Sequence, residues 1–229
     1  MFLSKIFIHI PKNAGMTIRH SDVLRKAILP AGPKVHKSKK YTTAVLKHMG
    51  SIGDHHGFEH SRWRDCNRGM IEAHGSFAVI RNPWDRVVSR YFFAKKVIEV
   101  EKKEPAGKHP LDSFEHFLED RHKWGGMEYM WHRAVRGWYP QFDYVIDDKE
   151  KIRCDILRFE NLNDDLCSYF GIKEMTRARN VTGLNKGSYK DIYTPQTIQI
   201  IADWYKKDID AFGFDFDTGA TKNYWRLTQ

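Results

Sequence analysis

The chain has 229 residues and a formal net charge of +9, and 41% of its residues are hydrophobic. This composition excludes an intrinsically disordered chain, and the length predicts a single domain over residues 1–229 with one substantial core. The three cysteines form no CxxC pair, so we expect neither a disulfide framework nor a zinc site built on thiolates.

The positive charge favours anionic partners, such as a nucleotide, a nucleic acid, an acidic membrane surface or a polyanionic substrate, without choosing among them. No stretch approaches the roughly 18 apolar residues that a membrane span needs. The N-terminus lacks the charged start, the long apolar run and the cleavage site of a signal peptide. We therefore expect a soluble protein without a membrane span, suited to a reducing compartment.

The first predicted element is a buried parallel strand over residues 6–10, because this segment is apolar almost throughout. Residues 11–16 follow as a short loop. We expect Thr17 to cap a helix that ends at residues 30–33, where prolines and a glycine interrupt the pattern. The buried face of this helix is predicted to carry Ile18, Leu24, Ala27 and Ile28.

The middle of the chain begins with residues 34–70, which are basic and rich in histidine and glycine. This composition predicts short helices and loops. A second buried strand is expected over residues 77–80, followed by a helix with Asn82 as its N-cap and Pro83 in its first turn. The charged residues 99–110 are expected to form an exposed, mobile loop.

The second half of the chain continues the alternation of helices and strands. One or two helices are predicted over residues 111–138, then a helix that ends at Gly171 and a long last helix that begins at Thr194. Strands are predicted over residues 142–146 and 154–158. This alternation predicts the α/β class, with a mostly parallel central sheet between two layers of helices.

The loop after the first strand has the composition of a phosphate-binding loop. A strand, a glycine-containing turn and a helix start aim backbone N–H groups at one point. Lys12 adds a positive charge, and Thr17 adds a hydroxyl group. The loop differs from the G-x-x-x-x-G-K-[ST] motif of ATPases and kinases, because its lysine precedes its only glycine, Gly15. The alternative is an ordinary turn with a surface lysine.

A second candidate anion site follows the second strand. Arg81 is expected where that strand ends, and ligands of open α/β sheets bind at strand ends. Its guanidinium group can bind a phosphate through two parallel hydrogen bonds, and Ser89 offers a hydroxyl two turns into the next helix. The alternative for Arg81 is a structural ion pair with an acid such as Asp85. Two sites of this kind suit a ligand with two separated phosphate groups.

These residues resemble a known family. Residues 7–17, FIHIPKNAGMT, resemble the 5′-phosphosulfate loop of sulfotransferases that use 3′-phosphoadenosine 5′-phosphosulfate (PAPS), especially those of the carbohydrate type. Residues 77–89, FAVIRNPWDRVVS, resemble the 3′-phosphate segment of that family. Residues 158–162 and 193–214 are similar to two further recurring segments.

The resemblance implies a P-loop nucleotide-hydrolase-like fold and a direct, in-line transfer from PAPS that requires no metal. It implies that Lys12 stabilises the leaving phosphate and that Arg81 and Ser89 hold the 3′-phosphate. Asn13 and Ala14 depart from the threonine and glycine that are commoner in this loop, where backbone amides do most of the binding. The implied donor-binding residues are Lys12, Asn13, Ala14, Gly15, Met16, Thr17, Ile18, Arg81, Ser89 and Lys186.

A hydroxyl acceptor needs a general base, which is often a histidine in this family. His60 is the first candidate, because residues 60–63 resemble a family segment that precedes the arginine motif, and His56 is the second. A zinc site on His55, His56 and His60 is an alternative, but the sequence places no acidic or thiol partner at a suitable spacing. Glu160 is a further candidate base, with a buried structural carboxylate as the alternative.

Two other functions stay open from sequence alone. A nucleotide kinase or phosphotransferase would need a Gly-Lys-Ser/Thr order and a metal-binding acid at a strand end. A non-catalytic polyanion- or nucleic-acid-binding protein would account for the positive charge, although no helix-turn-helix, zinc-finger or RNA-binding motif is found.

The resemblance also predicts the partners and the compartment. We expect PAPS and its product, 3′-phosphoadenosine 5′-phosphate (PAP), as ligands, a glycan or another hydroxyl-bearing molecule as acceptor, and no nucleic acid. It places a bacterial or viral protein in the cytoplasm and a trimmed eukaryotic one in the Golgi lumen.

Overall fold

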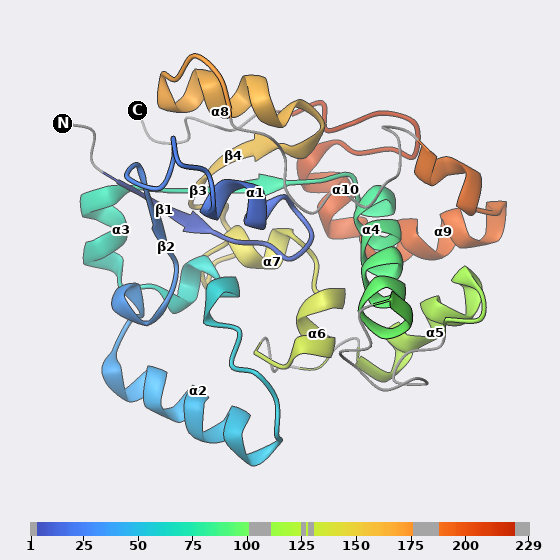
Figure 1. Ribbon diagram of the computed structural model, residues 1–229, viewed down its shortest axis with the longest axis horizontal. Helices are drawn as coiled ribbons and strands as arrows, with labels where there is room; N and C mark the ends of the chain where they lie inside the picture. The colour runs from blue at the N-terminus through green and yellow to red at the C-terminus, as the bar shows by residue number, and fades with distance from the viewer. Residues whose placement is uncertain (1–3, 101–110, 125–126, 128–130, 176–187, 223–229) are drawn as a thin grey trace.

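The computed structural model describes residues 4–100, 111–124, 127, 131–175 and 188–222. Its centre is a sheet in the order β2-β1-β3-β4, in which all neighbouring strands are parallel. Helices flank this sheet (Figure 1), so the predicted α/β class is confirmed. The strands are β1 (Lys5–Ile8), β2 (Ile28–Pro30), β3 (Ser76–Ile80) and β4 (Asp155–Arg158).

The strand order creates a switch point between β1 and β3. From β1 the chain runs to β2 on one side, and it then crosses to β3 on the other side of β1. Ligands of open parallel sheets bind outside the carboxyl ends of the strands at such a point. The register pairs Ile8 with Ala78, so the segments that follow β1 and β3 leave the sheet next to each other.

Each face of the sheet has its own hydrophobic core, because successive side chains of a strand point to opposite faces. In β1, Ile6 and Ile8 belong to the larger core, whereas Phe7 belongs to the smaller one. The smaller core packs the sheet against α1 (Gly15–Arg19) and α8 (Leu162–Phe170).

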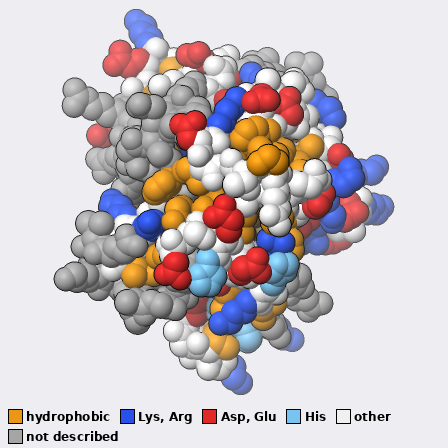
Figure 2. Space-filling model, turned by 90° about the vertical axis from the view of Figure 1, so that its right-hand side faces the viewer, with side chains coloured by type: hydrophobic (Ala, Val, Ile, Leu, Met, Phe, Trp, Pro, Cys, Tyr) orange, Lys and Arg blue, Asp and Glu red, His pale blue; other side chains and the backbone are white. Residues whose placement is uncertain are grey.

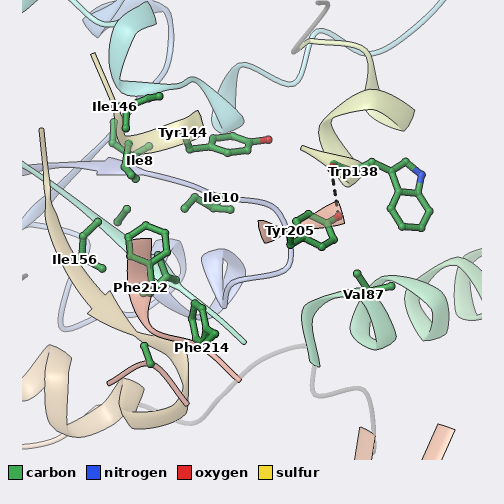
Figure 3. Packing of buried hydrophobic residues seen from close by; sticks show 14 of the residues in the cluster. Ile8, Ile10, Val87, Trp138, Tyr144, Ile146, Ile156, Tyr205, Phe212 and Phe214 are labelled. Carbon is green, nitrogen blue, oxygen red and sulfur yellow. Dashed lines mark hydrogen bonds between the residues drawn. The ribbon is translucent and has the colours of Figure 1, made fainter. Parts of the chain in front are cut away.

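The larger core lies on the opposite face, where side chains from several helices converge (Figure 3). Within it, the Tyr205 hydroxyl donates a hydrogen bond to the Trp138 carbonyl at 3.2 Å (Figure 3). Helices therefore cover both faces of the sheet, which confirms the predicted layers. The helices whose residues join this core include α4 (Pro83–Lys95), α6 (Arg133–Trp138), α7 (Phe142–Val145) and α10 (Lys206–Phe212).

Short elements connect these layers. Residues 34–70 form helices and loops, as predicted, but their main helix, α2 (Lys39–Ser51), has 13 residues and is not short. Residues 101–110 of the predicted mobile loop lie outside the described residues. No helix in the described part of the chain has the length and hydropathy of a membrane span. The remaining elements are η1 (Pro33–Val35), α2 (Lys39–Ser51), η2 (Phe58–His60), η3 (Trp63–Asp65), α3 (Arg68–His74), η4 (Lys96–Val100), α5 (Phe114–Trp124), η5 (Phe159–Asn161), η6 (Ser188–Ile192) and α9 (Pro195–Trp204).

The predicted first helix is wrong in its start and its length. Helix α1 follows a left-handed Ala14, so Thr17 lies inside the helix and does not cap it. The helix ends at Arg19, and Ile28 lies in β2. Ile28 and Leu24 still pack in the smaller core. A helix, a turn and a strand thus bury apolar residues at the spacing that a single helix would give.

The predicted strand over residues 142–146 is a short helix, α7. The Asp208 carboxylate accepts hydrogen bonds from the backbone amides of Gln141 and Phe142 at 3.0 and 2.9 Å, and it thereby caps this helix. Tyr144 is fully buried. Because Asp208 comes from α10, far along the chain, the local alternation of side chains could not reveal this helix.

Several predicted helix ends are confirmed. Asn82 caps α4 by accepting a hydrogen bond from the Trp84 amide, and Gly171 ends α8 in a left-handed conformation. Thr194 caps α9. The last helix is divided at Tyr205, so α9 and α10 stand in place of one long helix.

Candidate functional site

Two arginines from the segment after β3 fix the loop between β1 and α1. Arg86 Nε donates a hydrogen bond to the Pro11 carbonyl at 3.1 Å, and Arg81 Nη1 donates one to the Lys12 carbonyl at 2.9 Å. Both carbonyl groups therefore point toward these arginines. Lys12 and Ala14 adopt left-handed backbone conformations, with φ values of 70° and 60°.

The buried side chain of Asn13 anchors the middle of this loop. Its Nδ2 donates hydrogen bonds to the Val79 carbonyl at 2.7 Å and to Gln141 Oε1 at 2.6 Å. Gln141 Oε1 also accepts from the Arg81 amide at 2.8 Å, and its Nε2 donates to the Asp208 carboxylate at 3.1 Å. A buried polar network of this kind holds its members in one arrangement. The loop is therefore held firmly against the end of β3.

The amides of Ala14, Gly15 and Met16 have no hydrogen-bond acceptor among the described residues. The first amides of a helix have no partner inside the helix, and left-handed residues before them create a concave group of N–H donors that binds anions. Position 15 needs glycine, because a Cβ there would overlap the imidazole ring of His9. The loop thus presents backbone donors at the β1–β3 switch point.

Lys12 precedes these amides in the loop, and its Nζ lies 4.1 Å from the centre of the Phe93 ring. Burial, followed by the positive charges of Arg81, Arg90 and Lys96, lowers the pKa of Lys12 to about 7. No carboxylate in the described part of the chain forms an ion pair with Lys12. An anion bound at the loop would supply the missing counter-charge.

Arg81 forms the ion pair that sequence analysis set against a phosphate-binding role. Its Nε and Nη2 each donate a hydrogen bond to the Asp85 carboxylate at 2.8 Å, and its guanidinium lies over the Phe159 ring. A guanidinium has five N–H donors. Asp85 uses two and the Lys12 carbonyl uses one, so two remain for a ligand. The phosphate-binding role of Arg81 stays a prediction.

The other residues predicted to bind the donor differ in exposure. Ser89 lies at a buried position of α4. Thr17 and Ile18 are buried in α1, whereas Met16 is exposed. Lys186 lies outside the described residues.

Comparison with known protein families identifies the general chemistry of this site. A sequence profile described as the sulfotransferase family matches residues 5–215, which include the loop after β1, the arginine motif and all strands of the sheet. The chain belongs to the sulfotransferase family. It is therefore a transferase that moves a sulfuryl group. No curated protein matches the chain.

In this sulfotransferase, His60 lies next to the loop after β1. His60 Nδ1 lies 2.8 Å from the His9 carbonyl oxygen, and the two ring centres are 4.3 Å apart. The His9 ring in turn lies against Gly15. Because a carbonyl oxygen can only accept, Nδ1 carries the proton and Nε2 of the neutral ring has a free lone pair. This is the form that a general base requires.

The surroundings of His60 keep its ring neutral. Burial, followed by the charge of Arg136, lowers the pKa of His60 to about 4. Arg19 contributes in the same direction, whereas the His9 carbonyl and Glu59 act against it. Glu59 Oε1 lies 3.9 Å from His60 Nε2. With these neighbours, His60 accepts protons only weakly.

His56, the second predicted base, has different neighbours. Its ring stacks on Phe58 with centres 4.3 Å apart, and its Nδ1 accepts a hydrogen bond from the Phe58 amide. None of its described contacts reaches the loop. A role for His56 stays a prediction.

A group formed by His55, His56 and Glu59 has possible metal-ligand atoms within 4.8 Å of one another. The Nδ1 atoms of both histidines already accept backbone amides, and the two rings pack against each other. The structure thus brings an acidic side chain, Glu59, next to these two histidines, which sequence analysis did not expect.

Glu160 has the structural role that was the alternative to a general base. Its Oε1 accepts a hydrogen bond from the Asn82 amide at 2.6 Å, next to the start of α4. Burial raises the pKa of this carboxyl group. Glu160 therefore supports the segment that carries Arg81.

Sequence analysis missed three residues around this site: His9, Arg136 and Gln141. Gln141 gives no local signal, because its partners Arg81 and Asn13 lie 60 and 128 residues away. The histidine at position 9 is visible within the motif, but only the fold brings it into contact with Gly15 and His60.

Proposed function

We propose that this sulfotransferase transfers the sulfuryl group of PAPS to a hydroxyl or amine of its acceptor, with a carbohydrate hydroxyl as the expected target. The observation that carries the proposal is the loop after β1. Lys12 and three backbone amides without an acceptor among the described residues lie there, at the β1–β3 switch point. Such donors suit the negative oxygens of a phosphosulfate group.

The 3′-phosphate of PAPS is assigned to Arg81 and Ser89. Asp85 and the Lys12 carbonyl orient the guanidinium of Arg81 and leave two N–H donors for this phosphate. Because ATP has no phosphate at the 3′ position, this contact would distinguish PAPS from ATP.

In the proposed step, the acceptor oxygen attacks sulfur in line with the bond from sulfur to the bridging phosphate oxygen. That S–O bond breaks, and its electron pair remains on the phosphate of PAP. Lys12 stabilises this charge, and His60 Nε2 takes the proton of the acceptor. Positioning and electrostatics supply the catalysis, as in phosphoryl transfer, and the step requires no metal.

Family membership favours this reading over a kinase and over a non-catalytic polyanion-binding protein. On the face shown in Figure 2, acidic and basic side chains are interspersed, and the described residues there form no continuous basic stripe. A stripe of that kind would be typical of a nucleic-acid-binding surface.

The test is calorimetric titration with PAP, ADP and ATP. We expect PAP to bind at least about tenfold more tightly than ADP or ATP, because a charge-assisted hydrogen bond contributes about 1.5–3 kcal/mol. Lys12→Ala should weaken PAP binding by about 10- to 100-fold. Lys47→Ala removes an exposed lysine of α2 and should leave binding unchanged. ATP binding as tight as PAP binding would reject the proposal in favour of a kinase.

A further inference from the structure

Phe93 of α4 lies against the ammonium group of Lys12. The Lys12 Nζ is 4.1 Å from the centre of the ring, which is a cation–π contact, and Phe93 is 38% exposed. Among the described residues, this ring is the one charge-stabilising contact found for the ammonium group. The face of an aromatic ring is negative, so it attracts a cation without adding a carboxylate that would repel an anionic ligand.

Helix α4 contacts the loop after β1 at two points of one face. Arg86 and Phe93 are seven residues apart, which is about two turns of a helix, so their side chains leave α4 on the same side. Arg86 Nε donates to the Pro11 carbonyl at 3.1 Å, and the Phe93 ring meets the side chain of the next residue, Lys12. Helix α4 and this loop lie next to each other in Figure 1. The helix therefore holds the loop at its backbone and at the side chain of Lys12.

The backbone of Lys12 is fixed separately from its side chain. Its φ value of 70° is left-handed, which is uncommon for a residue with a Cβ atom. Arg81 Nη1 donates a hydrogen bond to its carbonyl at 2.9 Å. Because the backbone is held in one place, the contact with the Phe93 ring determines where the ammonium group lies.

The charged groups that act on Lys12 are cations. Arg81 follows β3, Arg90 lies in α4 and Lys96 begins η4, and after burial these charges lower the pKa of Lys12. The acid in this segment, Asp85, is already paired with Arg81 at 2.8 Å. Like charges favour loss of the proton and displacement of the side chain. A negative ring face acts against both effects.

We propose that Phe93 is a positioning residue for Lys12, whose ring face holds the ammonium group charged and in one place, both in the free enzyme and while the donor is bound. This inference rests on the proposed function, because Lys12 is the residue that stabilises the leaving phosphate in the proposed step. The alternative is that Phe93 only covers the side chain of Lys12 with apolar surface.

The test replaces Phe93 by phenylalanines that carry one, two or three fluorine atoms on the ring. Fluorine weakens the negative face but scarcely changes the shape, so the burial of Lys12 stays the same. The pKa of Lys12 is read by NMR of lysine labelled at Cε, from the signal that Lys12→Ala removes. It should fall with each fluorine, by about 0.5–1 for three. The same series at Phe92, whose ring packs against Tyr91, should leave it unchanged.

Calorimetry with PAP tests whether the contact persists in the complex. Free Lys12, with a pKa of about 7, is largely charged at pH 6 and largely neutral at pH 8. If the ring holds the ammonium in both states, three fluorines should weaken PAP binding about three- to tenfold at pH 8, where binding must charge Lys12. At pH 6 the ring acts equally on the free and the bound enzyme, so the affinity should stay within about twofold.

Two results overturn the proposal. If the pKa of Lys12 does not fall along the Phe93 series, the ring provides apolar cover alone. If PAP binds more tightly at pH 6 and equally at pH 8, Lys12 leaves the ring when the donor binds, and Phe93 does not position it for the reaction.

Failure of the proposed function gives a different result. If the wild type does not bind PAP, the donor assignment fails, and the part of the proposal that concerns the complex is rejected with it. The pKa series needs no nucleotide, so it still decides whether Phe93 holds the charge of Lys12 in the free protein.

Discussion

The surroundings of Lys12 disfavour the positively charged form of its side chain, which the proposed reaction needs. Burial and the neighbouring cations Arg81, Arg90 and Lys96 lower the pKa of its ammonium group to about 7. A site that bound no anion would gain nothing from this arrangement. In the proposed complex with PAPS, the same cations would stabilise the phosphosulfate group, and Lys12 would regain its proton.

Binding of PAP should therefore be accompanied by proton uptake near neutral pH. Free Lys12 is partly deprotonated above pH 7, and the bound anion raises its pKa, so the affinity for PAP should fall as pH rises from about 7 to 8. Calorimetry in buffers of different ionisation enthalpy measures the protons taken up. Lys12→Ala should abolish the uptake. Uptake of the same size in that variant would assign the proton to another group.

Gln141 joins four elements through one side-chain amide. Its Oε1 accepts from Asn13 in the loop after β1 and from the Arg81 amide after β3, and its Nε2 donates to Asp208 of α10. Gln141 precedes α7, and its backbone amide donates a hydrogen bond to the same Asp208 carboxylate. The geometry of the loop therefore depends on elements that are distant in the sequence.

Replacement of Gln141 tests this junction. Gln141→Met keeps the approximate volume but leaves Asn13 Nδ2 and the Arg81 amide each without one partner inside the protein. We expect the free energy of unfolding, measured by urea denaturation, to fall by about 2–4 kcal/mol. Gln199→Met, on the exposed face of α9, should change it by less than about 0.5 kcal/mol. A loss below about 1 kcal/mol for Gln141→Met would show that the junction contributes little.

For the whole molecule, buried histidines link folding to pH. Burial lowers the pKa of His9, His36 and His60 below the ordinary value of 6.5, to about 4 for His60. The unfolded chain therefore binds more protons than the folded one once the pH falls below about 6.5. Stability that is fully present above pH 6.5 is lost as the pH falls toward 4.

Thermal unfolding measured between pH 7.5 and 5 should show this loss, with the melting temperature falling steadily below about pH 6.5. His60→Gln removes one of the groups responsible and should flatten the pH dependence. The window ends at pH 5 so that protonation of carboxylates contributes little. An unchanged slope in His60→Gln would show that His60 is not the source.

Local sequence predicted those elements whose signals lie within a few residues. The apolar runs of β1 and β3, the Asn82-Pro83 start of α4 and the glycine end of α8 all have this property. The residues of α7 alternate like a strand, and their helical form depends on Asp208. The segment up to Ile28 has helical spacing, but its last residues pair with β1 instead.

The sequence by itself determined the α/β class, the two candidate anion-binding segments and the resemblance to sulfotransferases, because each depends on a short motif or on a local alternation of side chains. Only the tertiary structure decided that His60 rather than His56 contacts the loop, that Arg81 pairs with Asp85, and that Arg136 is buried without a full set of partners. These features depend on burial and on contacts between distant segments. Burial and such contacts also set the pKa values of the site, and no local pattern encodes them.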